Sequence, residues 1–401
     1  DIKGNNRTHS NVIMREISLQ EGDAFNMSKI RDSERNIREL GYFKEATIES
    51  EPGDNPDQAK LKVQVEEQRT GELKLTGGFS TTDGFMAGFG VSERNFMGKG
   101  QIVHADLGIS RRYQDINVGI TEPYLFNRPL IGSIDLYSTR SSRVESYVTK
   151  STGTNIGLGY HITQNLTQRF TYSIHKDSVS QIANDASPHL QNDPRNSIMS
   201  SLNHNLTYDR RDNTQDPTRG YVISLSNTYA GLGGNVRHVR NDVTGTIFYT
   251  PIEDLTLLGR LAAGRLDRVG GKRIRIVDAI YLGGDTLRGF EYAGVGPRDS
   301  RGRKDALGGR KYWKGTVEAQ FPVGLPVDFG VKGALFTDFG SVWHAPVQGH
   351  VIDTKKVRMS WGASIIWKGP FGPLRIDYAI PFKKTPHDET QRINLGYALP
   401  L

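Results

Sequence analysis

Residues 374–380 read Leu-Arg-Ile-Asp-Tyr-Ala-Ile, and this stretch decides the fold class. Apolar side chains alternate there with Arg375, Asp377 and Ala379, so an extended segment would have one apolar face and one mostly polar face. Strands of membrane barrels have this period because one face contacts lipid and the other faces the lumen. Residues 316–321 repeat the pattern, and Glu318 falls on the polar face.

Strand-like segments recur throughout the chain after residue 70, separated by turn clusters. We place them near residues 71–79, 84–93, 100–109, 114–122, 131–142, 152–162, 166–176, 201–209, 220–231, 240–250, 255–268, 311–321, 327–341, 357–368, 372–380 and 390–398. They number about sixteen, and single-chain bacterial barrels have an even number of strands. We therefore predict a transmembrane antiparallel β-barrel over residues 70–401.

The connections between these segments alternate between short and long, which is typical of outer-membrane barrels. The short ones include residues 163–165, 251–254 and 321–326, and the long ones are about 177–200, 269–310 and 342–356. We expect the short turns on the periplasmic side and the long loops outside the cell.

Composition agrees with this reading and excludes several others. Hydrophobic residues make up 36% of the 401 residues, and no run approaches the roughly eighteen apolar residues of a membrane helix. The mean hydropathy of -0.50 is compatible with a barrel, whose strands give a weak hydropathy signal. A soluble propeller or a pair of sandwiches is the alternative, but no blade repeat is visible.

Charge and cysteine content limit the partners and the kinds of site that the chain can have. The net charge is +7, but the basic residues are scattered, which argues against nucleic-acid binding and favours attraction to anionic lipid headgroups. The chain has no cysteine, so disulfides, thiolate metal sites and a cysteine nucleophile are excluded.

The sequence pattern of residues 1–69 differs from that of the rest and predicts a small α+β domain. Asn26 or Ser28 can cap a helix that runs to Leu40, and Gly41 stands where a helix commonly ends. A shorter helix is expected near 10–16, and strands are expected at about 43–50 and 60–67. The predicted order is strand, helix, helix, strand, strand, with a clipped first strand at residues 1–3. Since no signal peptide is visible there, we expect a mature chain or a fragment.

Catalytic and metal-binding motifs are missing from the sequence. No nucleophile elbow, zinc-protease motif or phosphate-binding loop occurs, and the ten histidines lack ligand spacing. His344 and His350 lie in a long loop, where solvation is the simpler reading. We therefore predict no catalytic residue, no metal and no cofactor, although the residue inventory leaves a barrel lipase open.

The loop 269–310 is the most informative region, because a connection of about forty residues is either functional or disordered. Its apolar and glycine-rich stretches indicate packing. Arg288 would then need carboxylate partners, since an unpaired buried charge is very unfavourable. Strand alternation points Glu318 and Asp338 into the lumen from adjacent strands. A loop folded inward would place Arg288 between them in a forked contact, and three unrelated charges in a polar lumen remain the alternative.

Several motifs resemble those of a known family, the outer-membrane protein 85 superfamily. The sequence as a whole resembles members from alphaproteobacteria. In the first seventy residues the similarity is to a POTRA (polypeptide-transport-associated) domain. The quoted motifs are Glu21-Gly22-Asp23-Ala24-Phe25, Leu40-Gly41-Tyr42-Phe43, Tyr208-Asp209-Arg210-Arg211-Asp212, Leu287-Arg288-Gly289-Phe290 and Phe336-Thr337-Asp338-Phe339-Gly340. The last two are similar to the inward-folded loop of the superfamily and the strand that receives it, and Glu318 falls at its second acidic position.

The resemblance implies a barrel-assembly factor of the bacterial outer membrane with its POTRA domain in the periplasm, and no enzyme. Its expected partners are unfolded outer-membrane protein precursors, lipoproteins of the assembly machinery, and outer-membrane lipid and lipopolysaccharide. Clients would enter at a weak seam between the first and last strands, where Gly77, Gly78, Gly396 and Pro400 reduce strand stability.

Two features depart from the family pattern. One POTRA domain is present where the assembly factors have several, and the chain ends in Leu401 where an aromatic residue is usual. A secretion porin of the same superfamily and a TamA-type assembly factor are therefore kept as alternatives.

Overall fold

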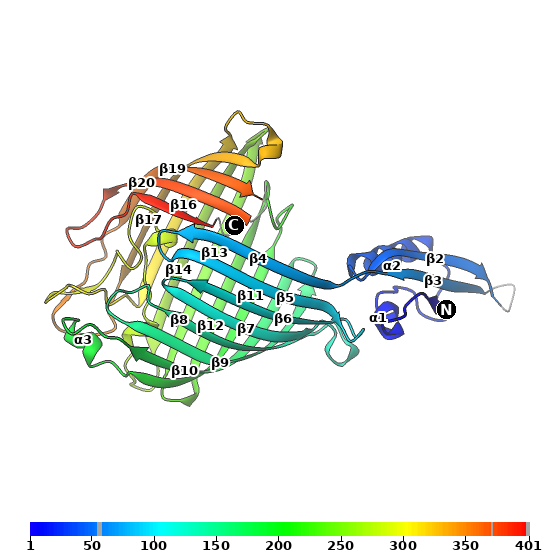
Figure 1. The fold of residues 1–401 in the computed structure, drawn as a ribbon, viewed down its shortest axis with the longest axis horizontal. Helices are drawn as coiled ribbons and strands as arrows, with labels where there is room; N and C mark the ends of the chain where they lie inside the picture. The colour runs from blue at the N-terminus through cyan, green and yellow to red at the C-terminus, as the bar shows by residue number, and fades with distance from the viewer. Residues whose placement is uncertain (54–57, 370–371, 398–401) are drawn as a thin grey trace. The chain divides into compact units, whose positions relative to one another are not determined.

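The structure, a computed structural model, describes residues 1–53, 58–369 and 372–397 (Figure 1). They form two compact units. The first comprises Asp1–Lys74, Gly90–Ala105 and Val118–Ser133, and the second comprises Leu75–Phe89, Asp106–Asn117 and Ile134–Leu401. No helix among the described residues is long and apolar enough to span a membrane.

The N-terminal part is a small α+β domain with the predicted element order. Its elements are β1 (Ile2–Lys3), α1 (Ser10–Met14), α2 (Met27–Glu39), β2 (Phe43–Pro52) and β3 (Ala59–Glu67). The sheet order is β1-β3-β2, with β1 parallel and β2 antiparallel to the central β3. The two helices and the sheet share one apolar core, formed by Val12, Ile13, Ile37, Tyr42, Phe43, Ala46, Val63 and Val65.

Local chemistry explains where helix α2 begins and ends. The side-chain oxygen of Asn26 accepts hydrogen bonds from the backbone N–H groups of Ser28 (2.9 Å) and Lys29 (3.3 Å). These donors have no partner within the helix, so the cap stabilises the first turn. Gly41 follows the helix with a φ of +70°, a conformation that glycine adopts without strain.

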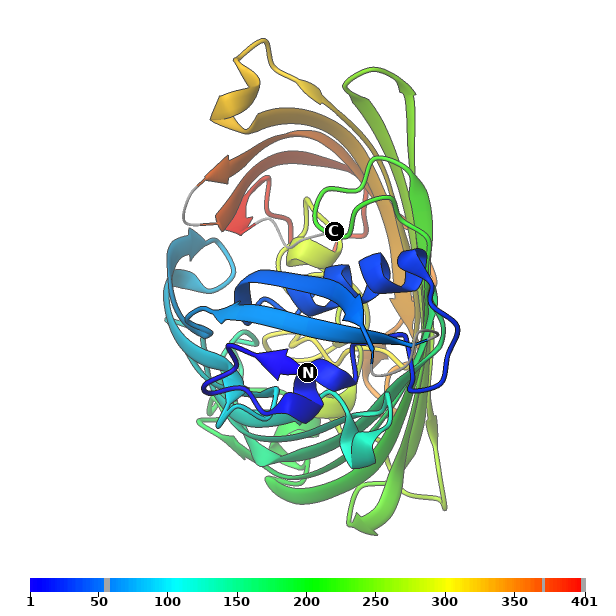
Figure 2. The same cartoon turned by 90° about the vertical axis from the view of Figure 1, so that its right-hand side faces the viewer.

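The rest of the chain forms a 16-stranded antiparallel barrel, which confirms the predicted fold class (Figures 1 and 2). Neighbouring strands follow one another in the sequence. They are β4 (Gly71–Ser80), β5 (Gly84–Phe96), β6 (Gln101–Ser110), β7 (Tyr113–Glu122), β8 (Ile131–Ser141), β9 (Val148–Thr163), β10 (Leu166–Ser180), β11 (Asn196–Asp209), β12 (Gly220–Gly234), β13 (His238–Ile252), β14 (Leu255–Arg268), β16 (Lys311–Pro322), β17 (Val331–Trp343), β19 (Arg358–Gly369), β20 (Gly372–Lys383) and β21 (Ile393–Tyr397). The short β15 (Arg298–Asp299) and β18 (Val351–Ile352) pair outside the barrel sheet.

The two faces of the strands differ as the alternation predicts. Val317 and Leu335 are 59% and 53% exposed on the outer face, whereas Glu318 and Asp338 are each 2% exposed on the inner one. The register places Glu318 opposite Phe336 and Thr316 opposite Asp338, so the two carboxylates lie diagonally on one face of the β16–β17 pair.

The connection expected at 177–200 is shorter in the structure. Strand β10 continues to Ser180 and β11 begins at Asn196, because these polar ends pair along the ladder although they lack apolar alternation. The remaining connection contains α3 (Pro188–Gln191), a one-turn helix that the sequence reading missed. Its signal was Ser187-Pro188, a capping serine followed by proline at the first helical position.

Replacing the cap of α2 tests this account of the N-terminal domain. Asn26→Ala should destabilise α2 by about 1 kcal/mol, because two amides of the first turn lose their acceptor. Hydrogen exchange of the α2 amides in the full chain should then be faster, and Asn26→Asp should restore protection. Equal exchange in all three proteins would contradict the assignment.

Candidate functional site

The loop 269–310 packs inside the barrel instead of extending from it. Viewed from the side shown in Figure 2, the yellow loop segment lies within the curved wall of strands. Its apolar side chains form a buried cluster with two strand residues, and the members are Leu266, Ile274, Ile280, Leu282, Leu287, Phe290, Val295 and Val342. Leu287 is fully buried and Phe290 is 1% exposed. This packing stabilises the inward position of the loop.

Arg288 lies between the two predicted carboxylates. Its Nε and Nη2 donate to the two oxygens of Asp338, each at 2.7 Å, and its Nη1 donates to Glu318 Oε2 at 2.8 Å. The backbone N–H of Arg288 also donates to Asp338, at 3.1 Å. The bidentate contact with Asp338 uses the planar guanidinium fork, so a lysine could not reproduce it.

Strand β20 adds two charges that the sequence reading did not connect to Arg288. Arg375 donates from Nη2 to Glu318 Oε2 at 2.6 Å and from Nε to Asp377 Oδ1 at 2.7 Å. Asp377 also lies 3.6 Å from Arg288. Two guanidiniums and three carboxylates therefore share one buried site, which we call the charge cluster. Alternation in 374–380 already put Arg375 and Asp377 on the inner face. It could not give their distance from Arg288.

The backbone around Arg288 is tightly enclosed. Its guanidinium lies 3.4 Å from the ring centroid of Phe336, a cation–π distance. Its carbonyl oxygen accepts a hydrogen bond from Ser360 Oγ at 2.5 Å. Gly289 has a φ of +92°, and a Cβ there would lie 3.0 Å from Ser360 Cβ. Both conformation and space therefore require glycine at this position.

Gly340, also among the predicted loop-clamp residues, lies two residues beyond Asp338 on β17. A Cβ at Gly340 would lie 2.9 Å from the carbonyl oxygen of Trp313 on β16. The structure gives Gly340 a packing role between neighbouring strands rather than a contact with Arg288.

The barrel sheet has two free ends, β4 and β21. Among the residues described, no ladder joins them, and the sheet order ends at these two strands. They meet near one point, where the N–H of Thr81 donates to the carbonyl of Leu395 at 2.8 Å. Gly77 and Gly78 lie in β4 and Gly396 lies in β21, which has only five residues. Pro400, the fourth predicted seam residue, is outside the described residues.

The inward loop also holds the segment that leads into β21. The N–H of Gln391 donates to the carbonyl of Gly289 at 3.0 Å, and Asn394 Nδ2 donates to Asp285 Oδ1 at 2.7 Å. Phe290 forms a β-bridge with Thr390. The loop that carries Arg288 is therefore bonded directly to the last strand at the seam.

Within the described part of the chain, no group of three or more histidine, aspartate or glutamate side chains could hold a metal ion. The buried carboxylates of the charge cluster are occupied by guanidiniums instead. The arrangement is a buried network of ion pairs in a loop that is also bonded to the last strand of the barrel sheet.

Comparison with known proteins places this arrangement in a family. The model described as Omp85 superfamily domain matches residues 95–398. The chain belongs to the Omp85 superfamily. A second model, the POTRA model described as surface antigen variable number repeat, matches residues 1–68.

Named relatives agree with the family assignment. The chain is 30% identical over its whole length to the outer membrane protein assembly factor BamA of Neorickettsia risticii and 26% identical over 98% of its length to BamA of Neisseria meningitidis serogroup B. It spans about half of each, 54% and 55%. A crystal structure of Haemophilus ducreyi BamA lacking POTRA domains 1–3 has the same fold, with a TM-score of 0.87 at 20% identity, over 98% of this chain and 82% of that one.

Removing the guanidinium tests the role of the charge cluster. Arg288→Ala leaves Glu318 and Asp338 buried with fewer partners, which should destabilise the folded barrel by about 3–5 kcal/mol. We expect faster hydrogen exchange across 269–310 and loss of the heat-modifiable gel band. Arg288→Lys should be intermediate, because an ammonium cannot bridge both carboxylates with a fork.

Arg265→Ala is the matched control, since Arg265 pairs with Asp267 but is 60% exposed. That change should shift stability by no more than about 1 kcal/mol. Arg288→Ala behaving like Arg265→Ala would show that the cluster does not hold the loop.

Proposed function

We propose that this chain is the membrane-embedded part of an assembly factor that folds and inserts barrel proteins into the bacterial outer membrane through the seam between β4 and β21. The observation that carries the proposal is the lack of a ladder between these strands in the described residues. Unpaired N–H and C=O groups at a strand edge template pairing with another chain. The names of the curated relatives, which are outer membrane assembly factors, favour assembly over secretion.

Both edges of the seam have features that weaken them. A Cβ at Gly77 would meet nothing within 4 Å, and one at Gly396 would lie 4.0 Å from Asp285 Oδ1. Packing therefore does not demand glycine at either place. Glycine in a strand loses more conformational freedom and contributes no side chain to the sheet. These positions favour a seam that separates at a low free-energy difference.

The charge cluster supports the same mechanism from inside the barrel. Arg288 fixes the loop, and Gly289 and Asp285 of that loop bond to residues 391 and 394 beside the seam. The clamp would hold the approach to β21 in place while its outer edge accepts a client strand. We assign Leu287, Arg288, Gly289, Phe290, Glu318 and Asp338 to this positioning role.

The remaining assignments follow from the assembly function. We place the barrel in the outer membrane and the POTRA domain, residues 1–69, in the periplasm, with the barrel domain at 70–401. Unfolded outer-membrane proteins would be the clients, and assembly lipoproteins, outer-membrane lipid and lipopolysaccharide would be the other partners. We propose no enzymatic activity and no cofactor.

A disulfide across the seam tests the proposal. The chain has no native cysteine, so Thr81→Cys with Leu395→Cys introduces a single pair at the point where β4 and β21 meet. We expect the oxidised protein to fail to support assembly of outer-membrane proteins in cells depleted of the parent. Reduction should restore assembly, because it frees the edges again.

Thr207→Cys with Ser224→Cys is the matched control. These residues face each other on β11 and β12, with hydroxyl oxygens 3.2 Å apart, in a ladder that the mechanism leaves closed. The oxidised control should support assembly. An oxidised seam pair that assembled clients at the parental level would reject insertion through the seam.

A further inference from the structure

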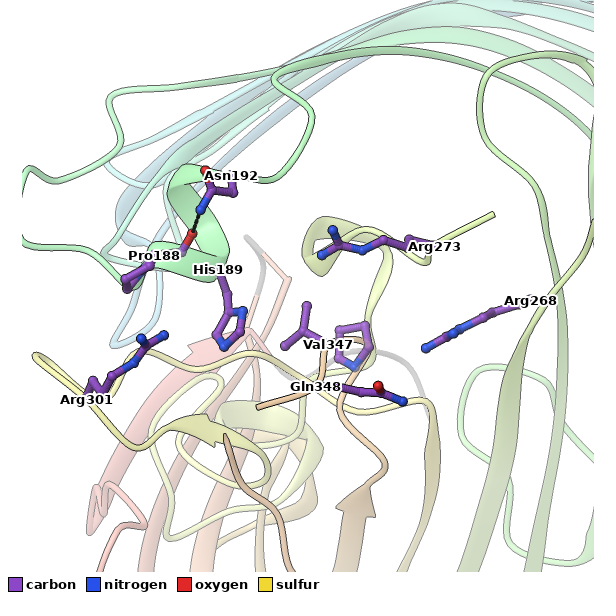
Figure 3. A pocket seen from close by; sticks show the side chains of 9 residues that line it. Pro188, His189, Asn192, Arg268, Arg273, Arg301, Val347 and Gln348 are labelled. Carbon is purple, nitrogen blue, oxygen red and sulfur yellow. Dashed lines mark hydrogen bonds between the residues drawn. The ribbon is translucent and has the colours of Figure 1, made fainter. Parts of the chain in front are cut away.

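A basic cavity lies among the long connections between barrel strands, and none of its lining residues belongs to the seam or the charge cluster. Its volume is about 540 Å³, and Figure 3 shows the side chains around it. Three connections contribute to the wall, those after β10, β14 and β17. The lining residues are Pro188, His189, Asn192, Arg268, Arg273, Arg301, Pro346, Val347 and Gln348.

The charged residues that line this cavity are all arginines, although Asp193, next to the lining residue Asn192, interacts electrostatically with Arg273. Three arginines line it and no aspartate or glutamate does. Arg301 is partly neutralised, because its Nε lies 3.4 Å from Asp299 Oδ1. Within the described ranges, no ion pair or hydrogen bond is formed by the side chains of Arg268 and Arg273. At least two guanidiniums therefore face the cavity with their donors open, whereas Arg288 and Arg375 in the charge cluster are fully engaged.

A buried apolar cluster joins the three connections that form the cavity walls. Ala186 and Leu190 pack with Ile276, Leu307 and Val347 in one buried apolar cluster that joins all three connections. Two polar contacts strengthen the junction. His189 Nε2 lies 2.9 Å from the carbonyl oxygen of Gly349, and the N–H of Ile276 donates to Asp193 at 2.9 Å. A site with fixed walls needs little reorganisation when a ligand binds.

Figure 3 shows Arg268 and Arg301 reaching into the cavity from opposite sides, with His189, Arg273 and Val347 between them. Guanidinium forks match the oxygens of a phosphate group in geometry and charge. The volume exceeds that of a single inorganic ion, so it has room for a ligand with more than one anionic group or with a sugar attached.

We propose that this cavity is a binding site for a phosphate-bearing ligand, with Arg268, Arg273 and Arg301 as the phosphate-binding residues. The ligand is a phosphate ester in the surrounding medium or the phosphorylated headgroup of an outer-leaflet lipid. By bridging three connections, it would fix the loop end of the barrel. The inference goes beyond the assembly function and does not depend on the seam, and only its lipid source rests on the outer-membrane location proposed above.

Calorimetric titration of inorganic pyrophosphate into the purified full chain in a neutral detergent tests the proposal. We expect saturable binding with one site per chain, weakened by added salt because the arginines are exposed. Arg268→Ala with Arg273→Ala should lower the affinity at least tenfold, and Arg301→Ala should lower it less, because Asp299 already offsets its charge.

Arg195→Ala is the matched control, because Arg195 is an exposed arginine of the same connection as His189 but does not line the cavity. It should bind pyrophosphate as the parent does. The variants should keep the heat-modifiable gel band, because the ladder pairing of Arg268 with His238 is backbone pairing and, among the described residues, the side chains of Arg268 and Arg273 form no hydrogen bond or ion pair. Non-saturable binding, or equal affinity in the parent and the Arg268/Arg273 double variant, would overturn the proposal.

A second arm separates the two sources of phosphate. The protein is placed in lipid nanodiscs that contain either phosphorylated or dephosphorylated lipid A, and pyrophosphate is titrated again. Weaker pyrophosphate binding only in the phosphorylated discs would assign the site to the lipid headgroup. Equal binding in both discs would assign it to a soluble phosphate ester.

Discussion

The buried guanidinium of Arg288 is the constraint on which the interior of this barrel depends. A charge that is 7% exposed needs partners of opposite sign within bonding distance, since an unpaired one would be strongly destabilising. Asp338 and Glu318 supply them from β17 and β16, and Arg375 shares Glu318 from β20. The loop 269–310 can satisfy Arg288 only by folding inward. One side chain thus links the position of a long loop to the register of three strands.

The clamp and the seam form one connected structure. The residues on either side of Arg288 bond to the segment that enters β21, and β21 is a free end of the sheet. In the proposed function the barrel opens at the seam, which requires the remaining wall to stay rigid. Ladders that run along neighbouring strands supply this rigidity over most of the circumference, and the charge cluster supplies it beside the opening. This division between a firm interior and a weak edge is the physical basis of the proposed assembly function.

Period-two alternation carried most of the fold prediction, because every spanning strand has one face toward the lumen. Together with the turn clusters it placed about sixteen strands, and it oriented Glu318 and Asp338 inward. Cap chemistry offered Asn26 or Ser28 as the start of α2, and the structure has Asn26 as the cap. It could not place Arg375 beside Glu318, because β20 and β16 are separated by two strands in the sheet and their distance depends on the curvature of the barrel. Strand ends at Ser180 and Asn196 were missed because polar residues pair there without an apolar face. The functional roles of the clamp and the seam stay proposals.

A double-mutant cycle at Arg288 and Asp338 tests the central claim most directly. The free energies of unfolding of the parent, Arg288→Met, Asp338→Asn and the double variant would be measured in denaturant under the same lipid conditions. Our account predicts a coupling of about 2–3 kcal/mol, in the upper range for residues in direct contact, because the second change removes a group that the first had already left unpaired. Changes that add to within about 0.5 kcal/mol would contradict it, since they would mean that Arg288 and Asp338 act independently and that their pairing does not hold the loop inside the barrel.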